Sequence, residues 1–510
     1  MNSNMDKQRI KSMRSRMILS AVIVLMGNAV LTSRGFAQAG AWLTHSHDEQ
    51  HSALSTVQSQ ALSAIHWHTP VDLHPPQGEI FIHYGSPLVT AGNTVIVPVK
   101  TGDNSFRVEA RNGATGKRLW LHNTSWQAPG ADFVPGMGPT IFGTQLFIPD
   151  IAGRVMVRQT PDLAKGAITR LYFYGVKNYR KNPTAYQQNV QINTPLSTDA
   201  SGNLYFGFVV LGSTPLNLRS GIARITPNGT GTWVSAATVS GDPSIIEVSM
   251  SCAPALSQDG SLLYVAVDDG SYGYLLALNS STLALENRVR LIDPSSGQNA
   301  IIFNASSAAP TVGPDGDVYF GVIENPFPNH NDRGWLLHFN STLTQTKIPG
   351  SFGWDDTPSI VPASMVPSYH GSSSYLLMSK YNNYGGVGTG DGKNRIAILD
   401  PTATEHDPVL PSTLVMKEVL TILGVTPDPD WPGGVKEWCI NTAAIDPFTK
   451  SVLANSEDGN LYRWDLTTNS FTQVITLSSG IGEAYTPTVI GADGTAYAIN
   501  DAILDAIGTK

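Results

Sequence analysis

Cysteine is nearly absent from the sequence, which excludes a fold held together by disulfide bonds. Cys252 and Cys439 are the only two cysteines in 510 residues, far fewer than small secreted domains with a disulfide framework carry. The chain has no adjacent cysteine pair and no CxxCH sequence, so a covalently attached haem is not expected. We expect two free thiols, because the cysteines fall in separate repeats described below and a bridge requires Cα atoms within about 7 Å.

Long hydrophobic runs are equally scarce, and the one present lies at the N-terminus. Basic residues precede an apolar run at 17–31, and small residues follow at Ala37 and Ala39. This order is typical of a secretory signal peptide. A retained membrane anchor is the alternative, but the run is shorter than the roughly 20 residues that a spanning helix needs. We predict cleavage after Ala39, a periplasmic or secreted protein, and no membrane span after processing.

Positive charge is low in the predicted mature chain. Residues 40–510 contain 26 Lys and Arg against 39 Asp and Glu, which gives a net charge of −13. Nucleic acid and anionic lipid are therefore not expected as partners. No low-complexity or charged linker divides these residues, so we predict a single domain over 40–510, in which an N-terminal segment 40–75 precedes the repeats.

The chain does contain an internal repeat. Each copy has a small residue, usually a Pro, then a β-rich run, a turn often containing Asp-Gly or Ser-Gly, and a second β-rich run. This pattern predicts an antiparallel hairpin. The eight copies span 85–99, 138–150, 194–208, 253–267, 309–322, 366–380, 442–456 and 486–500. Several copies are followed by a third strand that ends in Asn or Asp, at 274–282, 335–343, 395–403 and 461–469.

Eight such units predict an all-β fold, an eight-bladed β-propeller of four-stranded antiparallel blades. Pro87 and Pro487 are separated by seven repeats, so each repeat has about 57 residues. This is longer than the 40–50 residues of a usual four-stranded blade, and long loops account for the difference. A parallel β-helix is the alternative, but its repeats are shorter and lack the hairpin signal. The segment 412–424 fits an amphipathic turn or an outer strand. Residues 63–73 are expected to supply the outer strand of the last blade and so close the ring.

Two stretches resemble a known family. ARNGATGKRLW (110–120) resembles the tryptophan-docking motif of quinoprotein-type propellers, with Asn112 where Asp is usual, and the segment 42–55 resembles the N-terminal segment of PQQ-binding-like repeat proteins. The resemblance covers nearly the whole mature chain at the level of fold. It implies that Trp120 packs between adjacent blades. The family also includes dehydrogenases that hold PQQ over a Trp together with Ca²⁺, often beside a disulfide between adjacent cysteines. This chain lacks the adjacent cysteines. We therefore predict no cofactor, with Ca²⁺ and PQQ as the alternatives.

Propeller geometry predicts where a site lies. The loop that leads to each inner strand ends at the mouth of the central channel, so the polar residues just before each repeat converge there. They are His83, Tyr84, Gln191, Asn193, Ser251, Asn304, Asp355, Asp356, Glu437, Asn441 and Glu483. Carboxylates and amides around one opening suit a hard cation or a polar ligand such as a sugar. A solvated channel rim is the alternative.

These residues divide into three predicted roles. Ligand binding is predicted for His83, Gln191, Asn193, Asn304, Asp356, Asn441 and Glu483, and metal binding for Asp355, Asp356 and Glu437. Glu437 and Glu483 are the catalytic candidates, because neighbouring aromatic residues would raise their pKa values. Two long loops, 325–334 and 381–394, are expected on the same face. The histidines at positions 45, 47, 51, 66 and 68 are interpreted as packing residues, with metal binding as the alternative.

Three classes of function follow from these features. A periplasmic or secreted binding and scaffolding propeller comes first; it resembles in fold an outer-membrane assembly lipoprotein but lacks that protein's lipidated cysteine. A PQQ- and Ca²⁺-dependent dehydrogenase is the second class, and a carbohydrate- or lactone-active propeller enzyme is the third. The expected partner is a polar small molecule, a glycan or an envelope protein. The sequence leaves open whether the protein is an enzyme.

Overall fold

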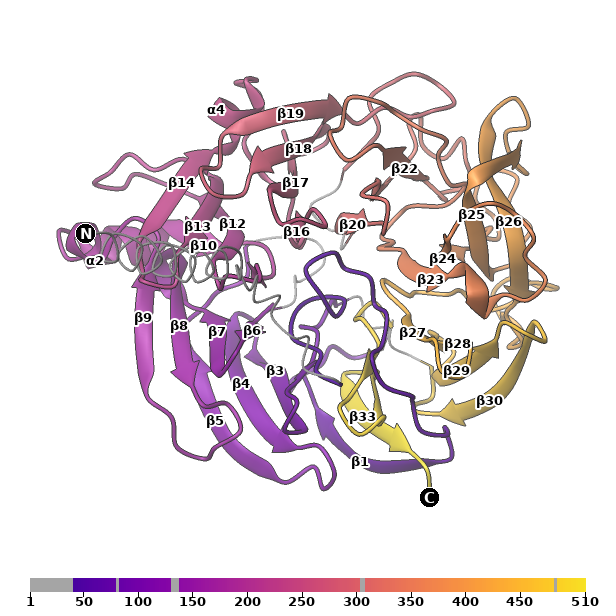
Figure 1. Ribbon diagram of the computed structural model, residues 1–510, viewed down its shortest axis with the longest axis horizontal. Coiled ribbons are helices and arrows are strands. Elements are labelled where there is room, and N and C mark those ends of the chain that lie inside the picture. Colours follow the sequence, from indigo (N-terminus) through magenta and orange to yellow (C-terminus); the bar gives the residue numbers. More distant parts are fainter. Residues whose placement is uncertain (1–39, 79–81, 130–136, 303–307, 481–483) are drawn as a thin grey trace, which may run out of the picture. The chain divides into compact units, whose positions relative to one another are not determined.

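The computed structural model describes residues 40–78, 82–129, 137–302, 308–480 and 484–510 (Figure 1). Their strands form eight separate antiparallel sheets that follow one another around a ring. The predicted eight-bladed β-propeller is therefore confirmed. The described helices are short: η1 (Ile151–Gly153), α2 (Val176–Tyr179), α3 (Pro183–Asn189), α4 (Ala236–Ser240) and η2 (Ala363–Met365). None of the described helices is long and apolar enough to cross a membrane.

The first four blades each consist of one sheet, and blades 3 and 4 have an innermost strand in two pieces. Blade 1 holds β2 (Leu88–Val89), β3 (Thr94–Gly102), β4 (Ser105–Asn112) and β5 (Arg118–Thr124). Blade 2 holds β6 (Thr140–Phe142), β7 (Gln145–Pro149), β8 (Arg154–Gln159) and β9 (Ile168–Tyr172). Blade 3 holds β10 (Val190–Ile192), β11 (Ser197–Thr198), β12 (Leu204–Val210), β13 (Gly221–Ile225) and β14 (Gly231–Ser235). Blade 4 holds β15 (Glu247–Val248), β16 (Ala255–Leu256), β17 (Leu262–Asp268), β18 (Gly273–Asn279) and β19 (Leu285–Arg290).

The second four blades include one sheet of three strands and one sheet that the N-terminal strand completes. Blade 5 holds β20 (Thr311–Val312), β21 (Val318–Val322) and β22 (Trp335–Phe339). Blade 6 holds β23 (Ser359–Pro362), β24 (Tyr375–Tyr381), β25 (Arg395–His406) and β26 (Leu414–Leu423). Blade 7 holds β27 (Ala444–Asp446), β28 (Ser451–Asn455), β29 (Asn460–Asp465) and β30 (Ser470–Thr476). Blade 8 holds β31 (Val489–Ile490), β32 (Ala496–Asn500), β33 (Ile503–Gly508) and β1 (Ala64–Pro70).

Burial within a blade follows from the radial packing. The middle strands are buried on both faces, as in β17 with its sequence LLYVAVD, because a neighbouring blade covers each face. The outer strand β30 instead alternates between exposed and partly buried residues. Polar tips pair between blades: the hydroxyls of Tyr319 in blade 5 and Tyr375 in blade 6 are 2.6 Å apart. The indole of Trp120 in blade 1 likewise donates to Pro161 O of blade 2 at 2.7 Å.

The two ends of the described chain meet in blade 8. Strand β1 pairs antiparallel with β33, from Ala64 opposite Gly508 to Pro70 opposite Ile503, and Figure 1 shows the two strands side by side. The predicted closure of the ring by residues 63–73 is confirmed. Of the two alternatives for the segment 412–424, the outer strand is correct, because most of the segment forms β26.

Residues 40–62, here called the axial segment, cross the middle of the ring before β1 begins (Figure 1). They form backbone hydrogen bonds to seven blades in chain order, and the Thr44 hydroxyl donates to Leu196 O beside the remaining blade, blade 3, at 3.3 Å. The backbone bonds join Trp42 N to Val89 O (2.8 Å), Ile141 N to Leu43 O (2.8 Å), Leu256 N to Glu49 O (2.8 Å), Val312 N to Gln50 O (2.9 Å), Ile360 N to Ser52 O (2.9 Å), Ile445 N to Ala53 O (2.9 Å) and Gln60 N to Gly494 O (2.8 Å). The axial segment thus covers the free edge that the innermost strands would otherwise present to the channel.

This course forces the axial segment into strained backbone conformations. Ser46 (φ 50°), His47 (φ 87°), His51 (φ 59°) and Ala53 (φ 53°) all have positive φ values. The left-handed region costs a residue other than glycine roughly 1–3 kcal/mol when the surroundings impose it. The hydrogen bonds to the blades fix the course of the backbone and offset this cost. Four residues with positive φ are therefore tolerated within eight positions.

Trp42 anchors the start of the axial segment and provides a test of its importance. Its side chain is 0% exposed and packs in the core shared by blades 1 and 8. We expect Trp42→Ala to lower the free energy of unfolding in urea by about 3–5 kcal/mol, because a large buried side chain is removed. The control Leu163→Ala, at a side chain that is 59% exposed, should change it by less than about 0.5 kcal/mol. Equal effects would show that the axial segment does not stabilise the ring.

Candidate functional site

A small cavity of about 30 Å³ lies where the axial segment meets the innermost ends of several blades. Its lining comes from the axial segment and from residues beside blades 1, 3, 4, 7 and 8: His45, His83, Tyr84, Gly85, Ser86, Pro195, Ser251, Asn441, Tyr485 and Pro487. Four predicted channel residues, His83, Tyr84, Ser251 and Asn441, are therefore brought together. We call this space the axial cavity. Burial lowers the pKa of His45 to about 3, helped by the nearby His51, and lowers the pKa of His51 to about 4.

His83 connects the axial cavity to the acidic side chains of blade 6. Its Nε2 lies 3.6 Å from Asp355 Oδ2, and its ring meets Tyr485 edge to face with 4.4 Å between centroids. Burial lowers the pKa of His83; the carboxylate of Asp355 opposes this shift and the charge of Lys380 adds to it. His83 is therefore a neutral imidazole at neutral pH, able to donate at one nitrogen and accept at the other.

Two of the predicted amide ligands, Asn193 and Asn441, form hydrogen bonds between blades. Asn193 Nδ2 donates to Val248 O of blade 4 at 2.8 Å, and Asn193 O accepts from Ser251 N at 3.0 Å. Asn441 Nδ2 donates to Asp355 O at 3.4 Å and to Thr357 Oγ1 at 3.3 Å. Gln191 lies in β10, where its backbone pairs with that of the adjacent strand β12. Hydrogen bonds of this kind hold neighbouring inner strands in register, which leaves fewer amide donors for a ligand.

Lys380, at the end of β24, is a buried cation close to the axial cavity. Its side chain is almost fully buried, with Nζ 5.6 Å from the ring centroid of Phe352 and 5.9 Å from that of Tyr485. Within the described residues, Lys380 Nζ forms no hydrogen bond or ion pair. Nζ is not among the fully enclosed polar atoms that lack a hydrogen bond, so water or a polar ligand can reach the ammonium of this otherwise buried side chain.

The charge of Lys380 opposes the rise that burial causes in the pKa values of three carboxyl groups, those of Asp332, Asp356 and Glu437. We call these four residues the mouth cluster. Burial raises the pKa of Asp356 to about 7, against the opposing effects of Lys380 and of a hydrogen bond from Ser379. Burial also raises the pKa of Asp332 to about 8, with the charges of Glu324 and Glu437 adding to it. The pKa of Glu437 rises to about 8 because of burial and the nearby Glu457. At neutral pH the mouth cluster therefore combines an ammonium with carboxyl groups that retain protons.

The predicted metal ligands do not form one group. Among the described residues, ligand atoms of three His, Cys, Asp or Glu side chains lie within 4.8 Å of one another only in the set Glu437, Cys439 and Glu457, so Asp355, Asp356 and Glu437 together are not such a set. Cys439 and Cys252 are both free thiols, as predicted. A set that includes a thiol suits Zn²⁺ rather than Ca²⁺, which prefers oxygen ligands. Lys436 Nζ also lies 3.7 Å from Glu457 Oε1 and partly neutralises this set.

The two long loops meet each other above blades 5 and 6. Asn331 Nδ2 donates to Asn383 Oδ1 at 2.8 Å, and Thr389 N donates to Asn331 Oδ1 at 2.8 Å. Gly388, with φ 55°, permits this contact, because an added Cβ would lie 2.4 Å from Asn331 Oδ1. The loops 325–334 and 381–394 are therefore in contact, whereas their position at the channel mouth stays a prediction. Asp332 of the mouth cluster lies in the first loop, and Lys380 directly precedes the second.

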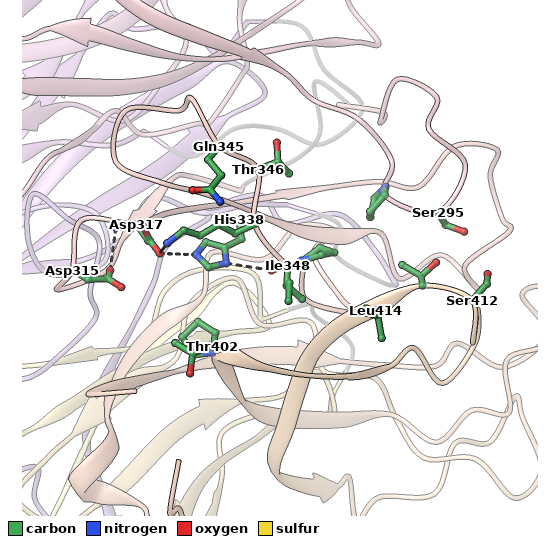
Figure 2. A pocket seen from close by; sticks show the side chains of 15 residues that line it. Ser295, Asp315, Asp317, His338, Gln345, Thr346, Ile348, Thr402, Ser412 and Leu414 are labelled. Atoms are coloured by element: carbon green, nitrogen blue, oxygen red, sulfur yellow. Dashed lines mark hydrogen bonds and ion pairs between the residues drawn. The ribbon is translucent and has the colours of Figure 1, made fainter. Parts of the chain in front are cut away.

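A second, larger hollow lies at the outer edge of the ring between blades 5 and 6 (Figure 2). This outer groove has a volume of about 970 Å³, and segment 345–349 lines it where blade 5 has no regular fourth strand in its described part. His338 Nε2 lies 2.9 Å from Asp317 Oδ2, and Lys347 pairs with the same carboxylate. His338 Nδ1 lies 3.2 Å from Ile348 O. Because these polar groups satisfy one another, the outer groove is a weaker candidate than the mouth cluster.

Some predicted residues lie outside the described part of the chain, and some functional candidates were not predicted. Asn304 and Glu483 fall in the segments 303–307 and 481–483, outside the described residues. Lys380, Asp332, Cys439 and Glu457 were missed. The available signal for Lys380 was a lysine that ends the apolar run YLLMS at the start of a long loop. Charged residues are almost never fully buried unless they are paired or functional.

No family model matches the sequence, and no curated protein matches it. Solved structures do match the fold at low sequence identity. A europium-containing methanol dehydrogenase superposes with a TM-score of 0.56 and 10% identity over 90% of this chain and 89% of that one. The quinohemoprotein alcohol dehydrogenase of Comamonas testosteroni superposes with a TM-score of 0.55 and 10% identity, over 94% of this chain and 82% of that one. Sqt1 of Saccharomyces cerevisiae superposes with a TM-score of 0.50 and 11% identity, over 89% of this chain and all of that one. The predicted resemblance to quinoprotein-type propellers is thus confirmed at the level of the fold.

The raised pKa of Asp332 predicts a pH-dependent contribution to stability. Its carboxyl group has an ordinary pKa near 3.8 when unfolded and about 8 when folded, so burial of the charge destabilises the protein as the pH rises between these values. Relative to Asp332→Asn, the wild-type free energy of unfolding should fall by up to about 1.4 kcal/mol per pH unit between pH 4 and 8. Urea unfolding at several pH values measures this. The exposed control Asp430→Asn should show no such slope, and a flat difference for Asp332→Asn would contradict the assignment.

Proposed function

We propose that the protein is an exported ligand-binding propeller and that the mouth cluster holds a polyhydroxylated molecule such as a sugar or a glycan end. The observation that carries the proposal is Lys380, whose ammonium lies beside the rings of Phe352 and Tyr485 and acts electrostatically on three largely buried carboxyl groups. Export rests on the sequence of residues 1–39, which lie outside the described part of the chain.

The chemistry of the mouth cluster suits hydroxyl groups. The ammonium of Lys380 donates three hydrogen bonds, and the protonated carboxyl groups of Asp332 and Glu437 each both donate and accept at neutral pH. A sugar hydroxyl has the same dual character and satisfies either partner. Phe352 and Tyr485, which flank Lys380, offer aromatic surface beside these polar groups, a combination typical of small-molecule sites.

A quinone-dependent dehydrogenase is the second candidate, because the chain shares its fold with a quinohemoprotein alcohol dehydrogenase and Lys380 would also accommodate an anionic cofactor such as PQQ. The described donors do not fit the Ca²⁺ that such a cofactor requires, since Asp355, Asp356 and Glu437 do not form one compact set and the compact set among the described residues contains a thiol. Glu437, with its raised pKa, and Glu483 stay candidates for a general acid in a carbohydrate- or lactone-active enzyme. Scaffolding of envelope proteins remains a further proposal of the same binding class.

The proposal is tested by calorimetric titration of the purified protein with a panel of neutral mono- and oligosaccharides. At least one sugar should bind, and Lys380→Met should weaken that binding at least about tenfold, or about 1.4 kcal/mol. The matched control Lys417→Met removes an exposed lysine of β26 and should leave binding unchanged. A parallel titration uses PQQ with Ca²⁺. Uptake of PQQ without sugar binding would favour the dehydrogenase, and binding of neither would reject both assignments.

A further inference from the structure

Two buried histidines of the axial segment each have a ring nitrogen with no hydrogen-bond partner. His51 is 0% exposed and His45 is 8% exposed. Nε2 of each ring is enclosed and makes no hydrogen bond. The two rings are close and nearly perpendicular, with 5.3 Å between centroids and 85° between planes. An unsatisfied buried polar atom costs about 1–3 kcal/mol, so a pair of them at one place calls for a ligand.

The hydrogen bonding of His51 determines what its free nitrogen offers. His51 Nδ1 lies 2.7 Å from Pro310 O, and a carbonyl oxygen only accepts, so Nδ1 carries the proton. Nε2 of the neutral ring then presents a lone pair. A histidine whose far nitrogen donates to a backbone carbonyl is the arrangement that orients an imidazole toward a metal.

We propose that the Nε2 atoms of His45 and His51 bind one divalent transition-metal ion of the Zn²⁺ class. Imidazole nitrogen is a preferred ligand of Zn²⁺, with bonds of about 2.0–2.1 Å, and an ion at this distance from both nitrogens is compatible with the 5.3 Å between the ring centroids. The axial cavity, which His45 lines, has about 30 Å³, which is room for a water molecule beside the His45 ring.

A carboxylate in the surroundings compensates part of the charge of a buried cation. Asp48 acts electrostatically on His51 and pairs with His47 at 3.1 Å. Buried charges are stable only when opposite charges or ligands accompany them. The positive φ of Ser46, His47 and His51 fits a turn held by an ion that joins residues 45 and 51.

This site is separate from the mouth cluster and does not depend on the proposed sugar ligand. Its ion would be structural, because it links two parts of the axial segment, and its ligands are already fully buried. The set Glu437, Cys439 and Glu457 is the competing place for a transition metal. The experiment must therefore distinguish the two.

The test starts from the purified full-length protein, stripped with a chelator and titrated with Zn²⁺ and with Co²⁺ as a coloured substitute. We expect one ion per chain. With Cu²⁺ in the same site, electron paramagnetic resonance should show couplings to two imidazole nitrogens, a readout that needs no variant. His45→Ala should lower the affinity at least about 100-fold, since even the loss of groups that support a ligand costs roughly 10–100-fold.

Two matched variants complete the design. His68→Ala removes an exposed histidine of β1, and Cys439→Ser removes the thiol of the competing set; both should retain the ion and its nitrogen couplings. Loss of binding in Cys439→Ser but not in His45→Ala would overturn the proposal. So would the absence of a tightly bound ion in the stripped and reloaded wild type, or a crystal structure with only water between the two rings.

Discussion

The innermost strand of each blade has one edge that no other strand of its own blade can cover, and the axial segment supplies the missing hydrogen-bond partners. Every blade is reached, in chain order, by a stretch of only about twenty residues. These hydrogen bonds join all eight blades to one continuous segment. The positive φ values of the axial segment and the closure of blade 8 by β1 both follow from this arrangement, because the same stretch must cross the ring and then leave it at the last blade.

The position of the axial segment in the channel also explains why polar side chains near it have shifted pKa values. Where the axial segment occupies the channel, polar groups that point inward lose contact with water, and burial changes their protonation. His83 is kept neutral, whereas Asp332 and Glu437 keep their protons up to about pH 8. The charge of the buried Lys380 limits how far the neighbouring carboxyl pKa values rise.

The sequence was most informative where a local pattern repeats. The hairpin signal located all eight blades, although the inner strand of blade 6, β23, lies before the predicted copy at 366–380 and the first run of that copy forms no strand. The β-rich run at 63–73 identified the closing strand. The roles of single side chains were harder to predict. Asn193 and Asn441 precede inner strands as expected, but their amides are used between blades, and nothing local distinguishes such an amide from a ligand. Lys380 and the pairing of His45 with His51 depend on contacts between distant segments. The axial segment has no hairpin or periodicity, since its partners are spread over the whole chain.

The order in which the axial segment meets the blades has a consequence for how the molecule assembles. Its residues are made first, yet their partners extend to Gly494, near the end of the chain. Contacts of such large sequence separation slow folding, because chain entropy is lost before they form. The end of the axial segment and β1 therefore have no partners until the last blade has been made. The contact of Gln60 with Gly494 and the pairing of β1 with β33 convert an open arc of blades into a closed ring.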